Sequence, residues 1–386
     1  MNFTITAGPR ILFGNGNIAK LPALVRSFGS KALIITGTSS FIRSFAAMHL
    51  FQELEAQGTE FHQIIIEGEP GPEAIDDAVA ENRNWQPSVV LAIGGGSVMD
   101  AGKAISAMLC EEGAISQYLE GVGKRQPSGR KIPLIAVPTT AGTGSEATKN
   151  AVITKQGENG YKKSLRHEHY VPDIALVDPE LTVSCPPFVT AASGMDAFTQ
   201  LLEAFLSDQS NAYTDTLALD GMTKLVSAIE KAVAKGDDTM ARSAMSYAAL
   251  VSGIALANAG LGVVHGFAQP LGSFFSVPHG VVCGTLMGPA NRITVEIAAR
   301  ESNWRVLDKY YRVAQLISRE SDRRKAIDEL LKFIEQLSNQ FELPLLSDFN
   351  INRNDLPLII QHTGLKNHPV QLNEDDLLWI LQQRMR

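Results

Sequence analysis

The segment GMDAFTQLLEAF (194–205) carries two polar side chains at a spacing that brings them together on a helix. Asp196 and Gln200 are four residues apart, so a helix holds both on one face, about one turn apart. A carboxylate oxygen is a ligand for Zn(II) or Fe(II), whereas the amide oxygen of glutamine is a weak, uncharged one. The pair is typical either of part of a metal site or of an ordinary helix face with an aspartate near the helix start.

The segment VVHGFAQPLGSFFSVPHG (263–280) repeats this spacing with imidazoles. His265 and Gln269 are four residues apart, and His279 follows a stretch that contains glycine and proline. Each histidine alone is also compatible with a hydrogen-bonded core or turn residue. The glycine and proline break allows the two imidazoles to converge, so the spacing is compatible both with these plainer roles and with a divalent metal shared with Asp196.

Both histidines lie in a stretch without Asp, Glu, Lys or Arg, between Arg242 and Arg292. Its part 243–264 is long enough to cross a bilayer. It is nevertheless rich in Ala, Ser and Gly and contains Asn258. We therefore expect a buried helix at the centre of a helical domain, not a membrane span.

Turns rich in glycine and small hydroxyl residues follow two predicted strands in the first half. In AIGGGSVMDAGKAI (92–105) a strand ends in three glycines, and Ser97 opens a helix whose free N–H groups and dipole suit a pyrophosphate. Met99 stands where the usual G-x-G-x-x-G fingerprint has its third glycine. In PTTAGTGSE (138–146) the hydroxyls suit ribose or phosphate. Each segment is also compatible with a plain turn or a capping loop.

A third turn, TGTSS (36–40), bears on the choice of cofactor. Sites that prefer NAD place an acidic side chain near the adenosine 2′-hydroxyl, where it repels a 2′-phosphate. Here Gly37 leaves room, and Thr38, Ser39 and Ser40 offer hydroxyl and backbone donors. If this turn meets the ribose, it favours NADP(H), with NAD(H) as the alternative.

Strand and helix patterns alternate in the first half and give way to helices alone in the second. This order predicts a doubly wound, mainly parallel α/β domain over 1–184 and an all-helical domain over 185–386. The predicted strands are 31–37, 61–68, 88–97, 132–140 and 172–181, with a helix at 72–85. The predicted later helices are 188–206, 211–235, 239–259, 281–299, 304–318 and 323–340.

The composition narrows the classes of function and location. A formal net charge of −7 and the lack of basic runs argue against nucleic acid as a partner. Three scattered cysteines, Cys110, Cys185 and Cys283, are too few for a disulfide framework or a thiolate zinc site and are typical of a reducing cytoplasm. The first residues lack a basic segment followed by an apolar one, so no signal peptide is expected.

Taken together, these motifs resemble the iron-containing (group III) alcohol dehydrogenases, from about residue 5 to at least residue 300. The motifs that carry the resemblance are GGGSVMDAGKAI, PTTAGTGSE, PDIALVDPEL, SGMDAFTQLLEAF and VVHGFAQPLG followed by PHG. The resemblance implies a dinucleotide-binding α/β domain, a C-terminal helical domain and an active site between them, in the architecture shared with dehydroquinate synthase.

The resemblance also implies which residues meet the cofactor. It assigns the pyrophosphate contacts and the lining of the cofactor site, and it makes Lys162 the cofactor-side lysine. Gly37 falls where members that prefer NAD carry an aspartate. The implied cofactor residues are Gly37, Thr38, Ser39, Ser40, Gly95, Gly96, Ser97, Asp100, Thr139, Thr140, Thr143, Lys162 and Leu181.

Members of this family usually bind one divalent metal through an aspartate and three histidines. Asp196, His265 and His279 match three of these positions, but Gln200 stands at the fourth. Gln269 stands where the family has a histidine taken to help proton transfer, and glutamine does not ionise near neutral pH. Either Gln200 ligates through its oxygen or a water takes its place, or the site has lost its metal.

We therefore expect an oxidoreductase that transfers hydride between NADP(H) and a small alcohol or aldehyde, assisted by Fe(II) or Zn(II). Proton transfer would pass through water, a ribose hydroxyl or Lys162. The alternatives are a metal-free reductase, a non-catalytic dinucleotide-binding relative, and a lyase resembling dehydroquinate synthase. The lyase needs basic side chains for an acidic substrate, and the charge-free stretch supplies none. A cytoplasmic homodimer or larger homo-oligomer is the expected state.

Overall fold

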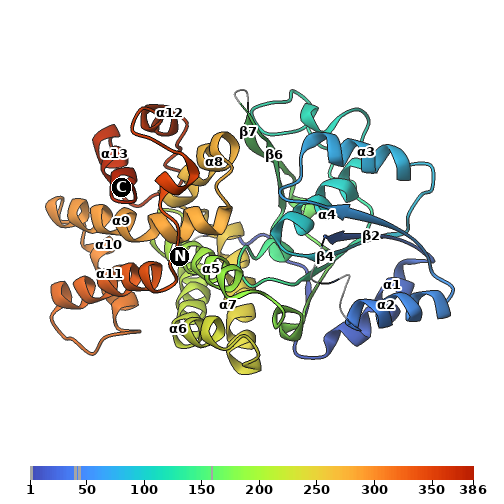
Figure 1. Cartoon of the computed structure of the whole chain (residues 1–386), viewed down its shortest axis with the longest axis horizontal. Coiled ribbons are helices and arrows are strands. Elements are labelled where there is room, and N and C mark those ends of the chain that lie inside the picture. Colours follow the sequence, from blue (N-terminus) through green and yellow to red (C-terminus); the bar gives the residue numbers. More distant parts are fainter. Residues whose placement is uncertain (1–2, 39–40, 42–44, 158–159) are drawn as a thin grey trace.

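The computed structural model describes residues 3–38, 41, 45–157 and 160–386. Figure 1 shows a half that contains the sheet beside a half built from helices. The sheet is parallel, with strand order β1-β8-β5-β4-β2-β3. Its strands are β1 Arg10–Phe13, β2 Lys31–Gly37, β3 Glu60–Ile66, β4 Val89–Gly94, β5 Leu134–Pro138 and β8 Ile174–Val177. The predicted parallel α/β class is confirmed.

Helices cover both faces of this sheet because its central strands are apolar on both sides. Along β2, Leu33 and Ile35 pack into one buried cluster, whereas Ala32 and Ile34 pack into the other. Successive side chains of a strand point to opposite faces, so the two clusters are the two layers. The first cluster includes side chains of α3 and α4, and the second includes side chains of α1 and α2. These helices are α1 Leu21–Phe28, α2 Phe45–Ala56, α3 Pro72–Asn82 and α4 Gly96–Met108.

A two-stranded antiparallel hairpin lies beside this sheet and is absent from the prediction. It pairs β6 Asn150–Lys155 with β7 Tyr161–Arg166. Its strands, NAVITK and YKKSLR, carry too many polar residues to show a clear apolar alternation. Strand β7 carries Lys162, the cofactor-side lysine that the resemblance implies.

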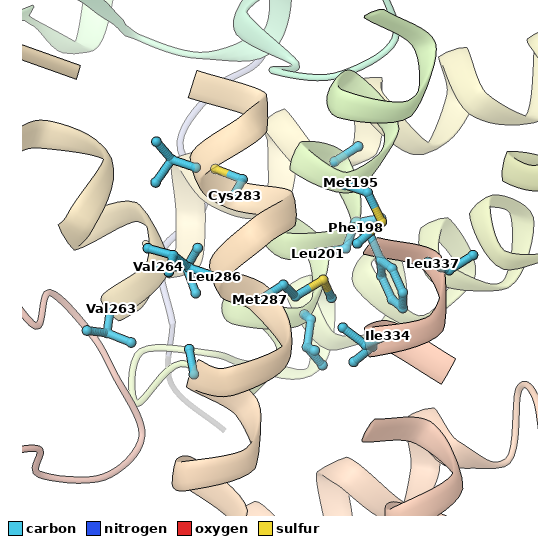
Figure 2. Packing of buried hydrophobic residues seen from close by; sticks show 14 of the residues in the cluster. Met195, Phe198, Leu201, Val263, Val264, Cys283, Leu286, Met287, Ile334 and Leu337 are labelled. Carbon is cyan, nitrogen blue, oxygen red and sulfur yellow. The ribbon is translucent and has the colours of Figure 1, made fainter. Parts of the chain in front are cut away.

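The second half is helical, as predicted, and the described residues after Val177 contain no strand. Buried side chains from α5, α8, α9 and α11 pack together at its centre (Figure 2). The longer helices are α5 Pro187–Leu206, α6 Ala212–Ala234, α7 Thr239–Ala259, α8 Val263–Phe275, α9 His279–Arg300, α10 Trp304–Ala314 and α11 Arg323–Gln340. Two short ones follow, α12 Leu356–Gln361 and α13 Glu374–Gln382. The division at 184/185 stays a prediction.

Among the described residues, α7 alone is long and apolar enough to cross a membrane. Of the apolar 18-residue window within this helix, 61% is buried inside the fold. The apolar stretch does not continue as one helix through 243–264, because α7 ends before Gly260 and α8 begins at Val263. Gly260 has φ 70°, a positive value that glycine adopts without strain. The burial is that of a core helix.

Candidate functional site

Helix α5 holds Asp196 and Gln200 on one buried face. The helix begins with Pro187 at its first turn, where proline has the required φ and no N–H is needed. Gln200 Nε2 donates to Asp196 Oδ1 at 3.3 Å, and Gln200 Oε1 accepts from the Ser252 hydroxyl at 3.1 Å. The predicted shared face is confirmed, and the amide nitrogen faces the carboxylate.

The two histidines converge on Asp196 from α8 and α9. The predicted break lies at residues 276–278, and His279 is the first residue of α9. The imidazole rings are 5.4 Å apart between centroids. His265 Nε2 lies 3.3 Å and His279 Nε2 lies 3.6 Å from Asp196 Oδ1. The three ligand-type side chains therefore meet at one point.

Glu203 fixes the ring of His265 and was overlooked in the sequence. Its Oε2 accepts from His265 Nδ1 at 2.7 Å, and its Oε1 accepts from the backbone N–H of Val264 at 2.8 Å. A carboxylate on one imidazole nitrogen directs the other nitrogen toward a metal. The signal was present, because Glu203 follows Asp196 by seven residues and so shares its helix face.

Cys283 is the second overlooked residue. Its Sγ lies 3.5 Å from His265 Nε2 and 3.9 Å from His279 Nε2. One ligand atom from each of Asp196, His265, His279 and Cys283 lies within 4.8 Å of all the others. The signal was again helical spacing, since Cys283 follows His279 by four residues.

The charges at this point suit a cation. Burial by itself raises the pKa of Asp196, but His279 and His265 outweigh it and lower this pKa to about 2. Burial lowers the pKa of His279 to about 4, although Asp196 opposes the shift. Asp196 is therefore ionised and His279 neutral near pH 7, the forms that bind metal. Burial by itself lowers the pKa of His265, but Cys283 and Glu203 outweigh it and raise this pKa well above 6.5, so a metal that binds there displaces a proton from His265. A carboxylate, two imidazoles and a sulfur at this spacing fit the divalent metal that the resemblance implies.

The first two glycine-rich turns pack against each other at the carboxyl ends of β4 and β5. A Cβ on Gly95 would lie 3.3 Å from Thr140 Oγ1, and one on Gly96 would lie 2.6 Å from Thr143 Cγ2. The second distance leaves no room for a side chain, so glycine is needed there. Among the described residues no side chain caps α4, whose N-terminus therefore offers N–H groups to a phosphate.

The Lys103 ammonium bridges the first two glycine-rich turns. Its Nζ lies 3.1 Å from Asp100 Oδ1, 2.6 Å from Ser145 Oγ and 2.9 Å from Thr148 Oγ1, and it also contacts the carbonyl oxygen of Asn150. Ser145 in turn donates to Asp100 at 2.6 Å. The buried ammonium thus neutralises Asp100, the residue that the resemblance assigns to the pyrophosphate.

The buried Glu146 in the same turn makes stability depend on pH. Burial raises the pKa of Glu146 from 4.5 to about 7, against its own backbone hydrogen bond and Lys103. Because the folded pKa is the higher one, the stabilising contribution is complete below about pH 4.5 and is lost as the pH rises to about 7. The loss is on the order of 3 kcal/mol at one pKa unit per 1.36 kcal/mol.

We expect the melting temperature of the wild type, relative to E146Q, to fall between pH 4.5 and pH 7. Glutamine keeps the shape of the side chain and does not titrate, so the difference isolates this carboxyl group. Differential scanning calorimetry of both proteins across this range measures it. A difference that stays constant with pH would show that Glu146 does not titrate there.

Lys162 and Gln269 lie on the two elements that meet beside the histidines. The Lys162 ammonium pairs with Glu69, and a Cβ added to Gly272 on α8 would lie 3.3 Å from Lys162 Nζ. Gln269 lies on α8, four residues after His265. The hairpin therefore brings Lys162 to the helix that carries the predicted relay position.

The remaining predicted cofactor residues lie at the carboxyl ends of the strands or in the segments that follow them. Gly37 ends β2, Thr38 follows it and is exposed, and Thr139 follows β5. Ser97 lies in the first turn of α4, and Leu181 packs against the cluster of α1 and α2. Ser39 and Ser40 lie outside the described residues.

Comparison with known proteins agrees with this arrangement. Residues 8–179 match the family model "Iron-containing alcohol dehydrogenase", and residues 190–385 match "Fe-containing alcohol dehydrogenase family, C-terminal". The 1,3-propanediol dehydrogenase of Klebsiella pneumoniae is 31% identical over 367 residues, which cover 92% of this chain and 91% of that protein.

Solved structures agree over the whole chain. A 1,3-propanediol oxidoreductase superposes with a TM-score of 0.88 at 28% identity, covering 100% of both chains. The sulfoacetaldehyde reductase of Bifidobacterium kashiwanohense in complex with NAD+ superposes with a TM-score of 0.80 at 26% identity, covering 100% of this chain and 99% of that one.

Proposed function

The chain belongs to the iron-containing alcohol dehydrogenase family, and we propose that it transfers hydride between NADP(H) and a small alcohol or aldehyde. The observation that carries the proposal is the convergence of Asp196, His265 and His279 on one point, with the glycine-rich turns on the adjoining half. The family implies a divalent metal and a nicotinamide cofactor. NADP(H) as the preferred form, and Fe(II) or Zn(II) as the metal, are part of the proposal.

In this account Asp196, His265 and His279 hold the metal. A divalent metal bound there supplies Lewis-acid polarisation of the substrate oxygen during hydride transfer. Glu203 keeps the His265 ring oriented, and Gln200 donates to Asp196. Glu203 and Gln200 hold the ligands in one geometry before the metal binds. The ligand side chains therefore lose less conformational entropy when it binds.

Other residues of the chain position the cofactor and handle the proton. Gly95, Gly96 and Ser97 present the start of α4 to the pyrophosphate. Gln269 does not ionise, so we assign the proton-holding role to Lys162, whose ammonium is paired with Glu69. Water would carry the proton between Lys162 and solvent.

Gly37 carries the cofactor preference in this proposal. We expect G37D to lower kcat/KM for NADPH at least about tenfold relative to NADH, because a carboxylate there repels the 2′-phosphate. The backbone tolerates the change, since the nearest atom to an added Cβ is Val98 Cγ2 at 3.7 Å. G37N has the same shape without charge and serves as the control. An NADPH/NADH ratio that is the same in the wild type and in both variants would contradict the role of this turn.

The function itself is tested with a panel of short aldehydes. Protein loaded anaerobically with Fe(II) or Zn(II) is mixed with NADPH, and loss of nicotinamide absorbance is followed together with alcohol formation. We expect turnover with at least one small aldehyde. No turnover with any aldehyde, despite bound metal and bound NADPH, would favour a non-catalytic dinucleotide-binding protein.

The remaining parts of the proposal concern where and in what form the protein works. We place it in the cytoplasm, which the three free cysteines support. We also expect a homodimer or larger homo-oligomer, which light scattering coupled to size-exclusion chromatography measures directly.

A further inference from the structure

Where Asp196, His265 and His279 meet, the fourth ligand-type side chain is Cys283 and not Gln200. A tetrahedral Zn(II) with Zn–N of ~2.0 Å and Zn–S of ~2.3 Å separates nitrogen from sulfur by about 3.5 Å and nitrogen from oxygen by about 3.3 Å. Cys283 Sγ lies 3.5 and 3.9 Å from the two Nε2 atoms. Asp196 Oδ1 lies 3.3 and 3.6 Å from the same two atoms. These four separations are close to those expected between ligands of one metal ion, and all four atoms lie within 4.8 Å of one another.

Gln200 presents the wrong atom to this point. A carboxylate only accepts hydrogen bonds, so the atom of Gln200 that faces Asp196 must be the amide nitrogen. An amide nitrogen is not a metal ligand. The amide oxygen is turned toward the Ser252 hydroxyl, which donates to it. Gln200 therefore positions Asp196 and leaves the fourth place to another group.

The backbone holds Cys283 in this place. It lies one turn after His279 on α9, a helix of 22 residues. The same helix packs Leu286 and Met287 into the helical core (Figure 2), which fixes its position and rotation. The Cys283 sulfur is buried, so no solvent competes with it for a cation.

We propose that Cys283 binds the metal as a thiolate, giving a donor set of Asp196, His265, His279 and Cys283. This inference rests on the proposed metal-dependent function. Binding breaks the S–H bond, the proton leaves to solvent, and the sulfur keeps the electron pair that it shares with the cation. A thiolate is softer than an imidazole or a carboxylate, so the set favours Zn(II) over Fe(II).

Co(II) is the probe, because sulfur-to-cobalt charge transfer gives a near-ultraviolet absorption band that nitrogen and oxygen ligands do not give. The metal-free full chain is titrated anaerobically with Co(II), and bound cobalt is counted by elemental analysis. We expect one cobalt per chain with the band in the wild type and in C110S, the matched cysteine control. C283S is expected to lose the band and to bind Co(II) at least about tenfold more weakly.

The outcomes separate this inference from the proposed function. One bound cobalt without the band in the wild type would overturn the role of Cys283 and leave the metal-dependent function standing. No bound cobalt would overturn both. If C283S does not fold, X-ray absorption at the cobalt edge of the wild type decides the matter. One sulfur neighbour at ~2.3 Å supports the proposal, and a shell of nitrogen and oxygen alone contradicts it.

Discussion

Replacing Asp196 with alanine is expected to reduce aldehyde turnover at least about 10³-fold, because the Lewis acid contributes several kcal/mol and each 1.36 kcal/mol is a factor of ten. Asp196 is the only carboxylate among the four converging ligand-type residues and contacts both imidazoles. Its removal takes away the negative charge that holds a divalent cation there. Steady-state assays with NADPH, with metal content determined on the same samples, measure both effects.

D328A is the control for this experiment, since Asp328 is exposed on α11 and distant in sequence from the site. It is expected to keep wild-type turnover and metal content. If D196A folds, lacks metal and still retains more than about a tenth of the activity, the chain works as a metal-free reductase. Circular dichroism of both variants shows whether they are folded.

Replacing Lys103 with methionine is expected to destabilise the sheet-containing half by about 3–5 kcal/mol, the usual result of breaking a buried charge network. Methionine fills a similar volume, but it removes the ammonium that pairs with Asp100 and donates to Ser145 and Thr148. Asp100 then remains as an uncompensated charge beneath the glycine-rich turns. The expected fall in melting temperature is about 5 °C or more, with weaker NADPH binding.

K224M provides the comparison, because Lys224 is exposed on α6. Calorimetry measures stability, and fluorescence titration with NADPH measures binding. A K103M protein as stable as K224M would mean that the buried ammonium contributes nothing net to the fold. If stability falls but NADPH affinity is unchanged, the two turns do not form the cofactor site.

The helices of the second half could be predicted closely because their local signals are strong. The predicted bounds 239–259 and 323–340 are those of α7 and α11. In α11, the N-cap Asp322 accepts from the backbone N–H of Lys325, which gives the helix a clear start. By contrast, the pairing of β6 with β7 depends on contacts between polar strands, which no local sequence pattern predicts.

The candidate site was predicted in part, for a similar reason. Helical spacing and the break before His279 indicated that the aspartate and the two histidines meet, and they do. Glu203 and Cys283 escaped notice although each has helical spacing from a predicted ligand. A buried glutamate or cysteine is visible as functional only when the atoms around it are known, because burial is a property of the packed helices and not of the local sequence.

The proposed function depends on the binding of one divalent metal by the converging side chains. The most direct test is elemental analysis of protein purified without a metal-binding tag, loaded anaerobically with Fe(II) or Zn(II) and then dialysed. We expect close to one metal ion per chain in the wild type and almost none in D196A. A wild-type chain that retains no metal after such loading would exclude metal-dependent catalysis and leave a metal-free reductase or a dinucleotide-binding protein.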